Sequence, residues 1–327
     1  MKVLVIGGTL FIGRLLVTEL VKAGHDVTVL HRRATHDLGS VGKKTIANLM
    51  ADRNDPAQIR AALAGQKFEV VFDNVYDWER GTTAAQVEAT ALAVGDTLQR
   101  YVFVSSVAAY GEGLNHYEGD GLAQENHPDA YVRNKAMSER MLFRLHQRYG
   151  MPVVTLRPPY IYGPGNPFHR ESFFWERFRD NRKIVIPGDG RRLMQFVFVK
   201  DMVTAAMAAM TIPAAVGHAF NIASPKAITQ VETVQALAEA AGKKDVELVK
   251  VAREKLLKAG GHPLGPKLYF GFYFDLPPIT MLVTKAQRVL KFKPTEFGTG
   301  LKDTYKAWKA ISVTLPVPDY SYEDSVL

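Results

Sequence analysis

The chain of 327 residues contains no cysteine. Without cysteine there is no disulfide, no thiol nucleophile and no thiolate ligand for a metal, which is consistent with a reducing compartment. No apolar run of about 18 residues occurs. Met1 leads directly into an apolar, strand-like segment instead of a charged and then apolar leader. These absences argue against a membrane-spanning helix and a secretory signal, and we expect a cytoplasmic protein.

A long basic segment is also missing, although the net charge is +8. The basic residues are scattered in short groups such as "HRR" at 31–33 and "GDGRR" at 188–192. A polynucleotide site gathers basic side chains on one surface. We therefore expect neither nucleic acid nor a membrane as a partner. His116, His127 and His169 show no partners at metal-ligand spacing, so no metal is expected.

Apolar, strand-like runs alternate with segments of helical period in the first half of the chain. The strands are expected at 2–7, 25–31, 45–52, 68–75, 100–106 and 152–157, and helices at 11–24, 56–65, within 79–97 and from near Tyr131. This alternation predicts an α/β fold with a doubly wound, parallel Rossmann-type sheet that binds its ligands at the carboxyl ends of the strands. From about residue 165 the rhythm changes, and aromatic residues, proline and glycine increase.

The first chemical motif is "VIGGTLFIG" at 5–13. Gly7 and Gly13 bracket a turn between a strand and a helix, where bare backbone lets a pyrophosphate approach the helix N-terminus. Glycines are also common in such turns for backbone reasons alone. The position of this turn, after the first strand, favours dinucleotide binding by the segment Gly7, Gly8, Thr9, Leu10, Phe11, Ile12 and Gly13.

The second strand ends where a dinucleotide fold contacts the adenosine ribose. An acidic residue there would select NAD, but His31 is followed by Arg32 and Arg33. Guanidinium groups match a 2′-phosphate better than a free hydroxyl, so we favour NADP over NAD. Asp52 is placed to accept a hydrogen bond from the adenine amino group, and a helix-capping role competes with that assignment.

The fifth expected strand stops at Ser105 and Ser106, on the edge of the sheet that binds ligands. Tyr131 and Lys135 are four residues apart, so they share one face of a helix. A tyrosine with a pKa near 10 is about 0.1% ionised at pH 7, which costs roughly 4 kcal/mol if it acts as a base. An ammonium at about 4 Å supplies roughly that amount. We therefore predict that Ser106, Tyr131 and Lys135 form a catalytic site for proton and hydride transfer.

With these motifs in place, the sequence resembles the extended short-chain dehydrogenase/reductase family, also called the NAD-dependent epimerase/dehydratase family. "GGTLFIG" is similar to its cofactor loop, "VFVSSVAAYG" to its strand-five signature and "YVRNK" to its Tyr-x-x-x-Lys motif. "LRPPYIYGPGNP" resembles the segment that passes the nicotinamide, which implies a cofactor contact for Pro158 and a substrate contact for Tyr160. Ser105, in the strand-five signature, is a further candidate for contacting the substrate. "FVFVKDMVTAAMAAM" resembles the strand and helix that return to the core.

The resemblance implies a domain division, a nicotinamide cofactor and a homodimer. Residues 1–165, together with about 195–225, are expected to form the NAD(P)-binding domain. About 166–194 and 226–327 are expected to form a smaller C-terminal substrate-binding region.

Departures from the family pattern narrow the reaction. Val107 and Ala108 follow Ser106 where the dehydratase branch has an Asp-Glu pair, which disfavours dehydration. Met194 occupies a position where the branches that act on nucleotide sugars have an arginine. Arg191, Arg192 or Arg170 are candidates to replace the missing phosphate contacts.

Three functions remain open from the sequence. The first is a redox enzyme acting on a small carbonyl or alcohol, and the second is a sugar or sugar-nucleotide epimerase that retains its NAD. The third is an RNA-binding role, because "GGTLFIG" and the closing segment are also similar to chloroplast stem-loop-binding proteins.

Overall fold

The protein is described here by a computed structural model, which covers residues 1–38, 40–41 and 44–327. The chain forms two compact units, and each unit is built from three separate stretches of the sequence. Unit 1 contains residues 1–159, 199–223 and 281–293, and unit 2 contains residues 160–198, 224–280 and 294–327.

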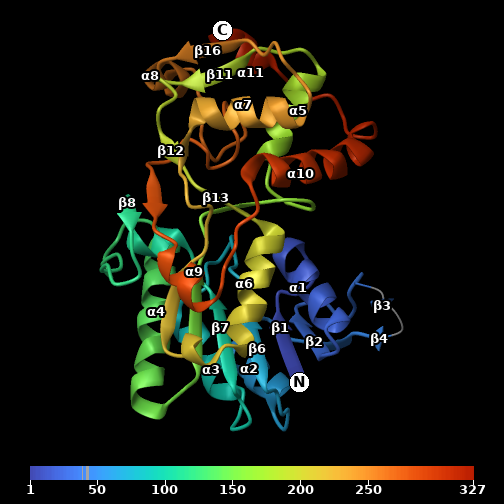
Figure 1. Cartoon of the computed structure of the whole chain (residues 1–327), viewed down its shortest axis with the longest axis vertical. Helices are drawn as coiled ribbons and strands as arrows, with labels where there is room; N and C mark the ends of the chain where they lie inside the picture. Colours follow the sequence, from blue (N-terminus) through green and yellow to red (C-terminus); the bar gives the residue numbers. More distant parts are fainter. Residues whose placement is uncertain (39, 42–43) are drawn as a thin grey trace. The chain divides into compact units, whose positions relative to one another are not determined.

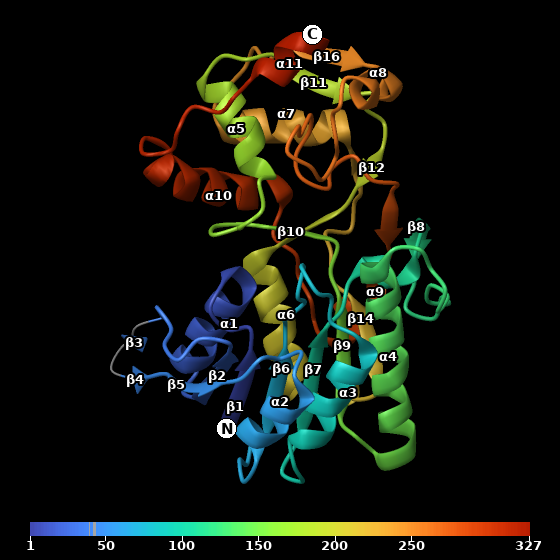
Figure 2. The same cartoon turned by 180° about the vertical axis from the view of Figure 1, so that it is seen from behind.

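Unit 1 is built on a parallel sheet that, in the described residues, has seven strands in the order β14-β9-β7-β6-β1-β2-β5 (Figures 1 and 2). The strands are β1 (Lys2–Ile6), β2 (Asp26–His31), β5 (Ala47–Met50), β6 (Val70–Asp73), β7 (Arg100–Val104), β9 (Val153–Arg157) and β14 (His218–Asn221). This order confirms the Rossmann-type sheet. Strands β1, β6, β7 and β9 are almost entirely buried, as expected for parallel strands that have helices on both faces.

Helices cover both faces of this sheet (Figures 1 and 2). One face carries α1 (Phe11–Lys22) and α6 (Val199–Thr211), which pack on each other. The other carries α2 (Pro56–Leu63), α3 (Ala84–Ala93) and α4 (Ala130–Tyr149), which pack in that order. Smaller elements of unit 1 are β3 (Ser40–Val41), β4 (Lys44–Thr45), η1 (Val107–Tyr110), β8 (Gly113–His116), η2 (Pro213–Ala215) and α9 (Thr284–Val289).

Local sequence explains where these helices begin and end. The side chain of Asp55 accepts hydrogen bonds from two backbone N–H groups at the start of α2, and Asp129 does the same for α4. Helix α4 ends at Gly150, whose φ of 68° suits a glycine. The cap at Asp129 therefore sets where α4 begins, and with it the positions of Tyr131 and Lys135 in the first turns of the helix.

Unit 2 consists of five helices and several two-stranded ladders in the described part of the chain. Its elements are β10 (Tyr160–Tyr162), α5 (Glu171–Arg179), β11 (Ile184–Pro187), β12 (Leu193–Met194), β13 (Phe196–Phe198), β15 (Ile228–Thr229), α7 (Gln230–Ala240), β16 (Leu248–Val251), α8 (Arg253–Lys258), α10 (Phe297–Ser312) and α11 (Ser321–Val326). Strand β17 (Ile279–Met281) lies at the boundary between the units in the sequence. The core of unit 2 is rich in aromatic rings, among them Phe174, Trp175, Phe270 and Phe274.

The observed division differs from the expected one mainly at residues 281–293, and residues 160–165, expected in the NAD(P)-binding domain, belong to unit 2. The family resemblance implies that residues 281–293 lie in the C-terminal substrate-binding region, whereas they belong to unit 1. Helix α9 packs against β14, and the Leu282 amide donates to the carbonyl of His116 at 2.8 Å. Among the described residues, no helix combines the length and the apolar character needed to cross a bilayer.

Candidate functional site

The turn after β1 is shaped by close contacts that only glycine permits. A Cβ atom on Gly13 would lie 1.9 Å from the carbonyl oxygen of Gly7, and one on Gly8 would lie 2.7 Å from Val29 Cγ1. Gly7 itself has a φ of 80°. Because no side chains separate them, the backbone of the turn packs closely against the start of α1. A dinucleotide pyrophosphate binds at this kind of turn, next to a helix N-terminus.

The start of α1 has no capping side chain of its own. Leu10 is the N-cap residue and makes no side-chain hydrogen bond to the helix, and the first turn carries no acidic residue. The positive end of the helix dipole is therefore not compensated locally. Thr9, Phe11 and Ile12 complete the segment, and the side chain of Leu10 is 60% exposed beside it. These residues fit a bound dinucleotide.

The end of β2 presents the three basic residues that the sequence analysis selected. His31 is partly buried, and burial, followed by the neighbouring His36, lowers its pKa. Its Nδ1 accepts a hydrogen bond from the Arg33 amide at 3.2 Å. Arg32 is 64% exposed and lies 3.6 Å from Asp77. This edge is therefore cationic mainly through its arginines, because a histidine of lowered pKa is mostly neutral at pH 7.

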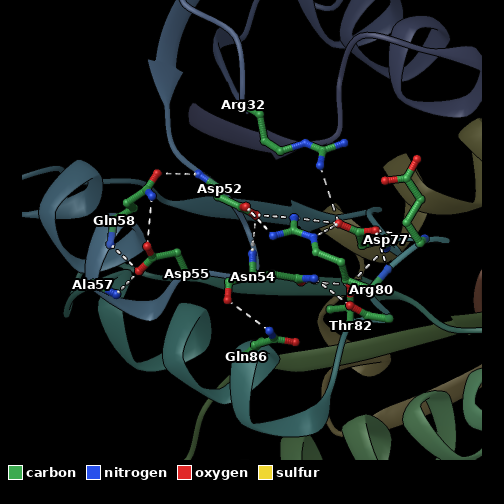
Figure 3. Close-up of polar contacts among 12 residues, drawn as sticks. Arg32, Asp52, Asn54, Asp55, Ala57, Gln58, Asp77, Arg80, Thr82 and Gln86 are labelled. Atoms are coloured by element: carbon green, nitrogen blue, oxygen red, sulfur yellow. Dashed lines mark hydrogen bonds and ion pairs between the residues drawn. The ribbon is translucent and has the colours of Figure 1, made fainter.

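Asp52 already has partners inside unit 1. Arg80 NH1 lies 2.8 Å from its Oδ2, and the Asn54 amide donates to its Oδ1 at 2.9 Å (Figure 3). The hydrogen bond from Arg80 lowers the pKa of Asp52. Asp52 is not the cap of α2, since Asp55 has that role. An adenine contact by Asp52 stays a prediction, and it would have to share the carboxylate with Arg80.

Lys135 lies on α4, and its buried ammonium group reaches the end of β7. It is 4% exposed, and its Nζ donates to the carbonyl oxygen of Val104 at 2.7 Å. The same Nζ lies 5.9 Å from the ring centroid of Tyr131 and 4.8 Å from that of Phe103. Burial lowers the pKa of Lys135 to about 8, although the buried carboxylate of Asp73 acts in the opposite direction. The ammonium is thus still largely charged at pH 7.

Ser105 and Ser106 have different surroundings although they are adjacent. Ser105 donates its hydroxyl to Glu139 at 2.5 Å, inside a buried network that includes Thr155 and Arg157. The Ser106 oxygen accepts from the Ala108 amide at 3.1 Å, so its proton is left to donate. A substrate contact by Ser105 is therefore less well supported than one by Ser106.

Small residues bring the Ser106 segment against the helix that carries Tyr131. Ala109, from η1, belongs to one apolar cluster with Val132 and Ala136 of α4. Pro158 joins the same region, because its carbonyl accepts from the Val107 amide at 2.9 Å. Unit 1 therefore gathers the glycine turn, the end of β2, Ser106, Tyr131, Lys135 and Pro158 on the carboxyl edge of one sheet, as Rossmann topology requires.

The remaining substrate candidates belong to unit 2. The Tyr160 hydroxyl donates to the carbonyl of Tyr273 at 2.8 Å, and burial raises its pKa to about 12. Arg192 lies 3.1 Å from the carboxylate of Asp275, and the Arg191 amide donates to Asp189. The charge of Arg192 is thus already balanced within its own unit.

Two histidines have carboxylate partners that the sequence analysis did not assign. His116 lies 2.8 Å from Asp120, and His169 lies 2.7 Å from Glu176. Over the described ranges, no group of three or more potential ligands is arranged to hold a metal ion.

Sequence reasoning missed the aromatic and charged residues between β6 and α3. Trp78 stacks on Tyr131 with ring centroids 4.9 Å apart, and Tyr76 approaches the same ring edge-on at 4.7 Å. Asp77, between them, pairs with Arg80. Their only signal in the sequence is the position of "YDW" immediately after a strand that ends on the ligand edge.

Comparisons with known proteins agree with this architecture. Residues 3–223 match the model of the NAD dependent epimerase/dehydratase family. The chain is 29% identical over its whole length to the chloroplast stem-loop binding protein of 41 kDa b of Arabidopsis thaliana, of which it covers 84%. It is 26% identical to a 2-alkyl-3-oxoalkanoate reductase of Stenotrophomonas maltophilia over 74% of this chain and 76% of the reductase.

A solved structure shows the same fold. UDP-glucuronic acid 4-epimerase from Bacillus cereus, in complex with UDP-glucuronic acid and NAD, superimposes with a TM-score of 0.74 at 19% identity, over 95% of this chain and 100% of the epimerase chain.

Proposed function

Because the chain belongs to the NAD-dependent epimerase/dehydratase family, a family of enzymes, we propose that it transfers hydride at a hydroxyl or carbonyl carbon of a small, sugar-like or other carbonyl substrate. The observation that carries this proposal is the buried Lys135, held at the end of β7 beside the ring of Tyr131. A buried cation beside a tyrosine, on the same sheet edge as a glycine turn, has an evident use in acid-base catalysis.

Each of the three residues has a distinct task in this proposal. Tyr131 exchanges a proton with the substrate oxygen, and the Lys135 ammonium favours the ionised phenol. Ser106 donates a hydrogen bond to the same oxygen. A bound nicotinamide supplies the hydride acceptor or donor. The backbone of the glycine turn and the open end of α1 hold the pyrophosphate.

Net reduction or oxidation is favoured over dehydration. The residues after Ser106, Val107 and Ala108, carry no carboxyl group that could help to remove water. A relative named as a reductase of an oxoalkanoate, which contains no sugar nucleotide, supports the same choice. A sugar or sugar-nucleotide 4-epimerase that retains its NAD is the alternative, because Ser106, Tyr131 and Lys135 serve both reactions equally well.

NADP is the proposed cofactor, in preference to NAD. Arg32 and Arg33 stand at the end of β2 without an acidic residue in the position that binds a ribose hydroxyl. Arg32 is exposed and only loosely paired, so its guanidinium is available to a phosphate.

The first test identifies, by mass spectrometry, any nucleotide released when the freshly purified protein is denatured. An empty protein that binds NADPH more tightly than NADH supports the reductase. NAD retained at near one per chain favours the epimerase instead. Tyr131→Phe should then abolish turnover and leave cofactor affinity nearly unchanged, and a variant that keeps more than about a tenth of the wild-type rate contradicts the assigned proton donor.

An RNA-binding role is the second candidate, favoured by the full-length similarity to a protein named for stem-loop binding. Failure to bind either NADPH or NADH, together with salt-sensitive binding of a stem-loop RNA, would move the assignment to it. We also propose a homodimer, which light scattering on the eluted protein tests.

A further inference from the structure

A tight turn follows β6, and it is organised around the side chain of Asp77. The Asp77 Oδ1 accepts hydrogen bonds from the amides of Glu79 and Arg80, each at 3.0 Å. Its Oδ2 accepts from the Arg80 guanidinium at 2.9 and 2.7 Å (Figure 3). Burial alone would raise the pKa of Asp77, but these hydrogen bonds outweigh it, and the pKa lies below its usual value. Asp77 is therefore ionised and fully engaged.

The turn is fastened to the segment that follows β5. Thr82 Oγ1 accepts from the Asp77 amide and donates to Asn54 Oδ1, both at 3.0 Å. Asn54 Nδ2 donates to the carbonyl of Gly81 at 2.6 Å, and Arg80 also pairs with Asp52 (Figure 3). This segment is the predicted adenosine end of the cofactor site.

The two neighbours of Asp77 contact the predicted catalytic tyrosine. Trp78 stacks on Tyr131 with an interplanar angle of 23°, and Tyr76 packs edge-on against the same ring. The Tyr76 hydroxyl accepts from Nδ2 of Asn134, the residue directly before Lys135 on α4, at 3.2 Å. Residues 76–78 thus make two sets of contacts. Asp77 contacts the adenosine end of the site, and Tyr76 and Trp78 contact Tyr131.

Arg32 is the partner of Asp77 that a ligand can most easily remove. It lies 3.6 Å from Asp77 Oδ2 and is 64% exposed, whereas Arg80 makes two short hydrogen bonds to the same oxygen. Exposed ion pairs are weak, and a phosphate dianion competes well for a guanidinium.

We propose that Asp77 is a positioning residue that connects the adenosine end of the cofactor site to Tyr131. In this proposal, which rests on the proposed NADP binding, a 2′-phosphate takes Arg32 from Asp77, and the turn transmits the change to the stacking of Trp78 on Tyr131. NAD, which lacks that phosphate, leaves the pair intact. Asp77 thereby makes the geometry at Tyr131 depend on which cofactor is bound.

The test uses two fragments that carry no nicotinamide and cannot reach Tyr131 directly. Binding of 2′,5′-ADP and 5′-AMP to the full chain is measured by calorimetry, and tryptophan emission is recorded in the same titrations. We expect 2′,5′-ADP to bind about tenfold more tightly than 5′-AMP, since it adds a charge-assisted contact. We also expect 2′,5′-ADP to change the emission and 5′-AMP to leave it unchanged. The variant Trp78→Phe, which keeps Trp175 and Trp308, should lose the change and so assign it to Trp78.

The matched variant is Asp77→Asn, which keeps an oxygen for the two amides of the turn and removes the charge that Arg32 contacts. It should still bind 2′,5′-ADP but lose the change in emission. Tight binding of 2′,5′-ADP without any change in wild-type emission overturns the connection and leaves the cofactor assignment standing. Equal affinity for the two fragments overturns both the proposed role of Asp77 and the assignment of NADP. An Asp77→Asn protein that responds like the wild type overturns the role of Asp77.

Discussion

Glu171 is a buried carboxyl group whose removal should make unit 2 more stable at alkaline pH. It is 4% exposed, at the start of α5, and Asn166 Nδ2 donates to its Oε2 at 2.9 Å. Its Oε1 is buried and has no hydrogen-bond partner in the part of the chain that the structure describes. Burial raises its pKa from 4.5 to about 7, and Asn166 and Arg170 offset only part of that effect.

The size and sign of the effect follow from proton linkage. A pKa of about 7 in the folded state, against 4.5 when unfolded, corresponds to about 3 kcal/mol. Below pH 4.5 the carboxyl is protonated in both states and costs nothing. As the pH rises through 7, the unfolded chain has already lost the proton and the folded chain must ionise a buried group. Stability from this residue is therefore present at low pH and lost at high pH.

The assay compares Glu171→Gln with its parent at pH 5 and pH 8 by denaturant unfolding. Both proteins carry Trp78→Phe, so that the remaining emission comes from Trp175 and Trp308 in unit 2. The amide is neutral at both pH values, and the unfolded carboxyl is already partly ionised at pH 5. The free energy of unfolding of the variant relative to the parent should therefore rise by about 2.5 kcal/mol from pH 5 to pH 8.

A control variant in the same helix separates this effect from a general change in charge. Glu176 lies 2.7 Å from His169 Nε2 and 3.8 Å from Arg177, so Glu176→Gln removes charged contacts and should destabilise unit 2 at both pH values. If Glu171→Gln shows the same relative stability at pH 5 and pH 8, the reasoning about its buried carboxyl is refuted.

The remaining predictions concern unit 1. Gly13→Ala should weaken NADPH binding, measured by calorimetry, by about 10- to 100-fold, because its methyl group would overlap the Gly7 carbonyl. The control Gly121→Ala places its methyl group in open space and should bind NADPH like the wild type. His31→Asp should shift the affinity ratio towards NADH, and an unchanged ratio removes the argument from the end of β2. Because burial lowers the pKa of Lys135 to about 8, its charge is lost as the pH rises through that value, and kcat should fall there. Lys135→Arg should move this fall to higher pH, and an identical pH profile in both proteins contradicts the role of the ammonium.

Much of unit 1 was predictable because its elements carry strong local patterns. The apolar strands, the glycine turn and the four-residue spacing of Tyr131 and Lys135 all follow from neighbouring residues. Residues 281–293 were assigned to the wrong part of the chain, since a short helix such as α9 reveals nothing of the strand it will pack on. The same limit applies to Ser105, because its partner Glu139 is 34 residues away and the sequence marks neither as a member of a pair.

The loop residues near the site were the least predictable. Tyr76, Asp77 and Trp78 follow no helical or strand period, and their contacts with Tyr131 and Arg32 join three different segments of the chain. The pKa of Lys135 also depends on burial, which the spacing of residues does not reveal.

The return of residues 281–293 to unit 1 has a consequence for synthesis on the ribosome. Asn221, at the end of β14, donates to the carbonyl oxygens of both His116 and Leu282, while the Tyr110 hydroxyl donates to Asn221. Unit 1 therefore lacks this packing partner until residues 281–293 have been translated. At about 5–20 residues per second, the edge strand β14 waits several seconds between its own emergence and that of α9. During that interval a nascent chain has an incompletely covered sheet edge, and chaperones that bind such edges have time to act.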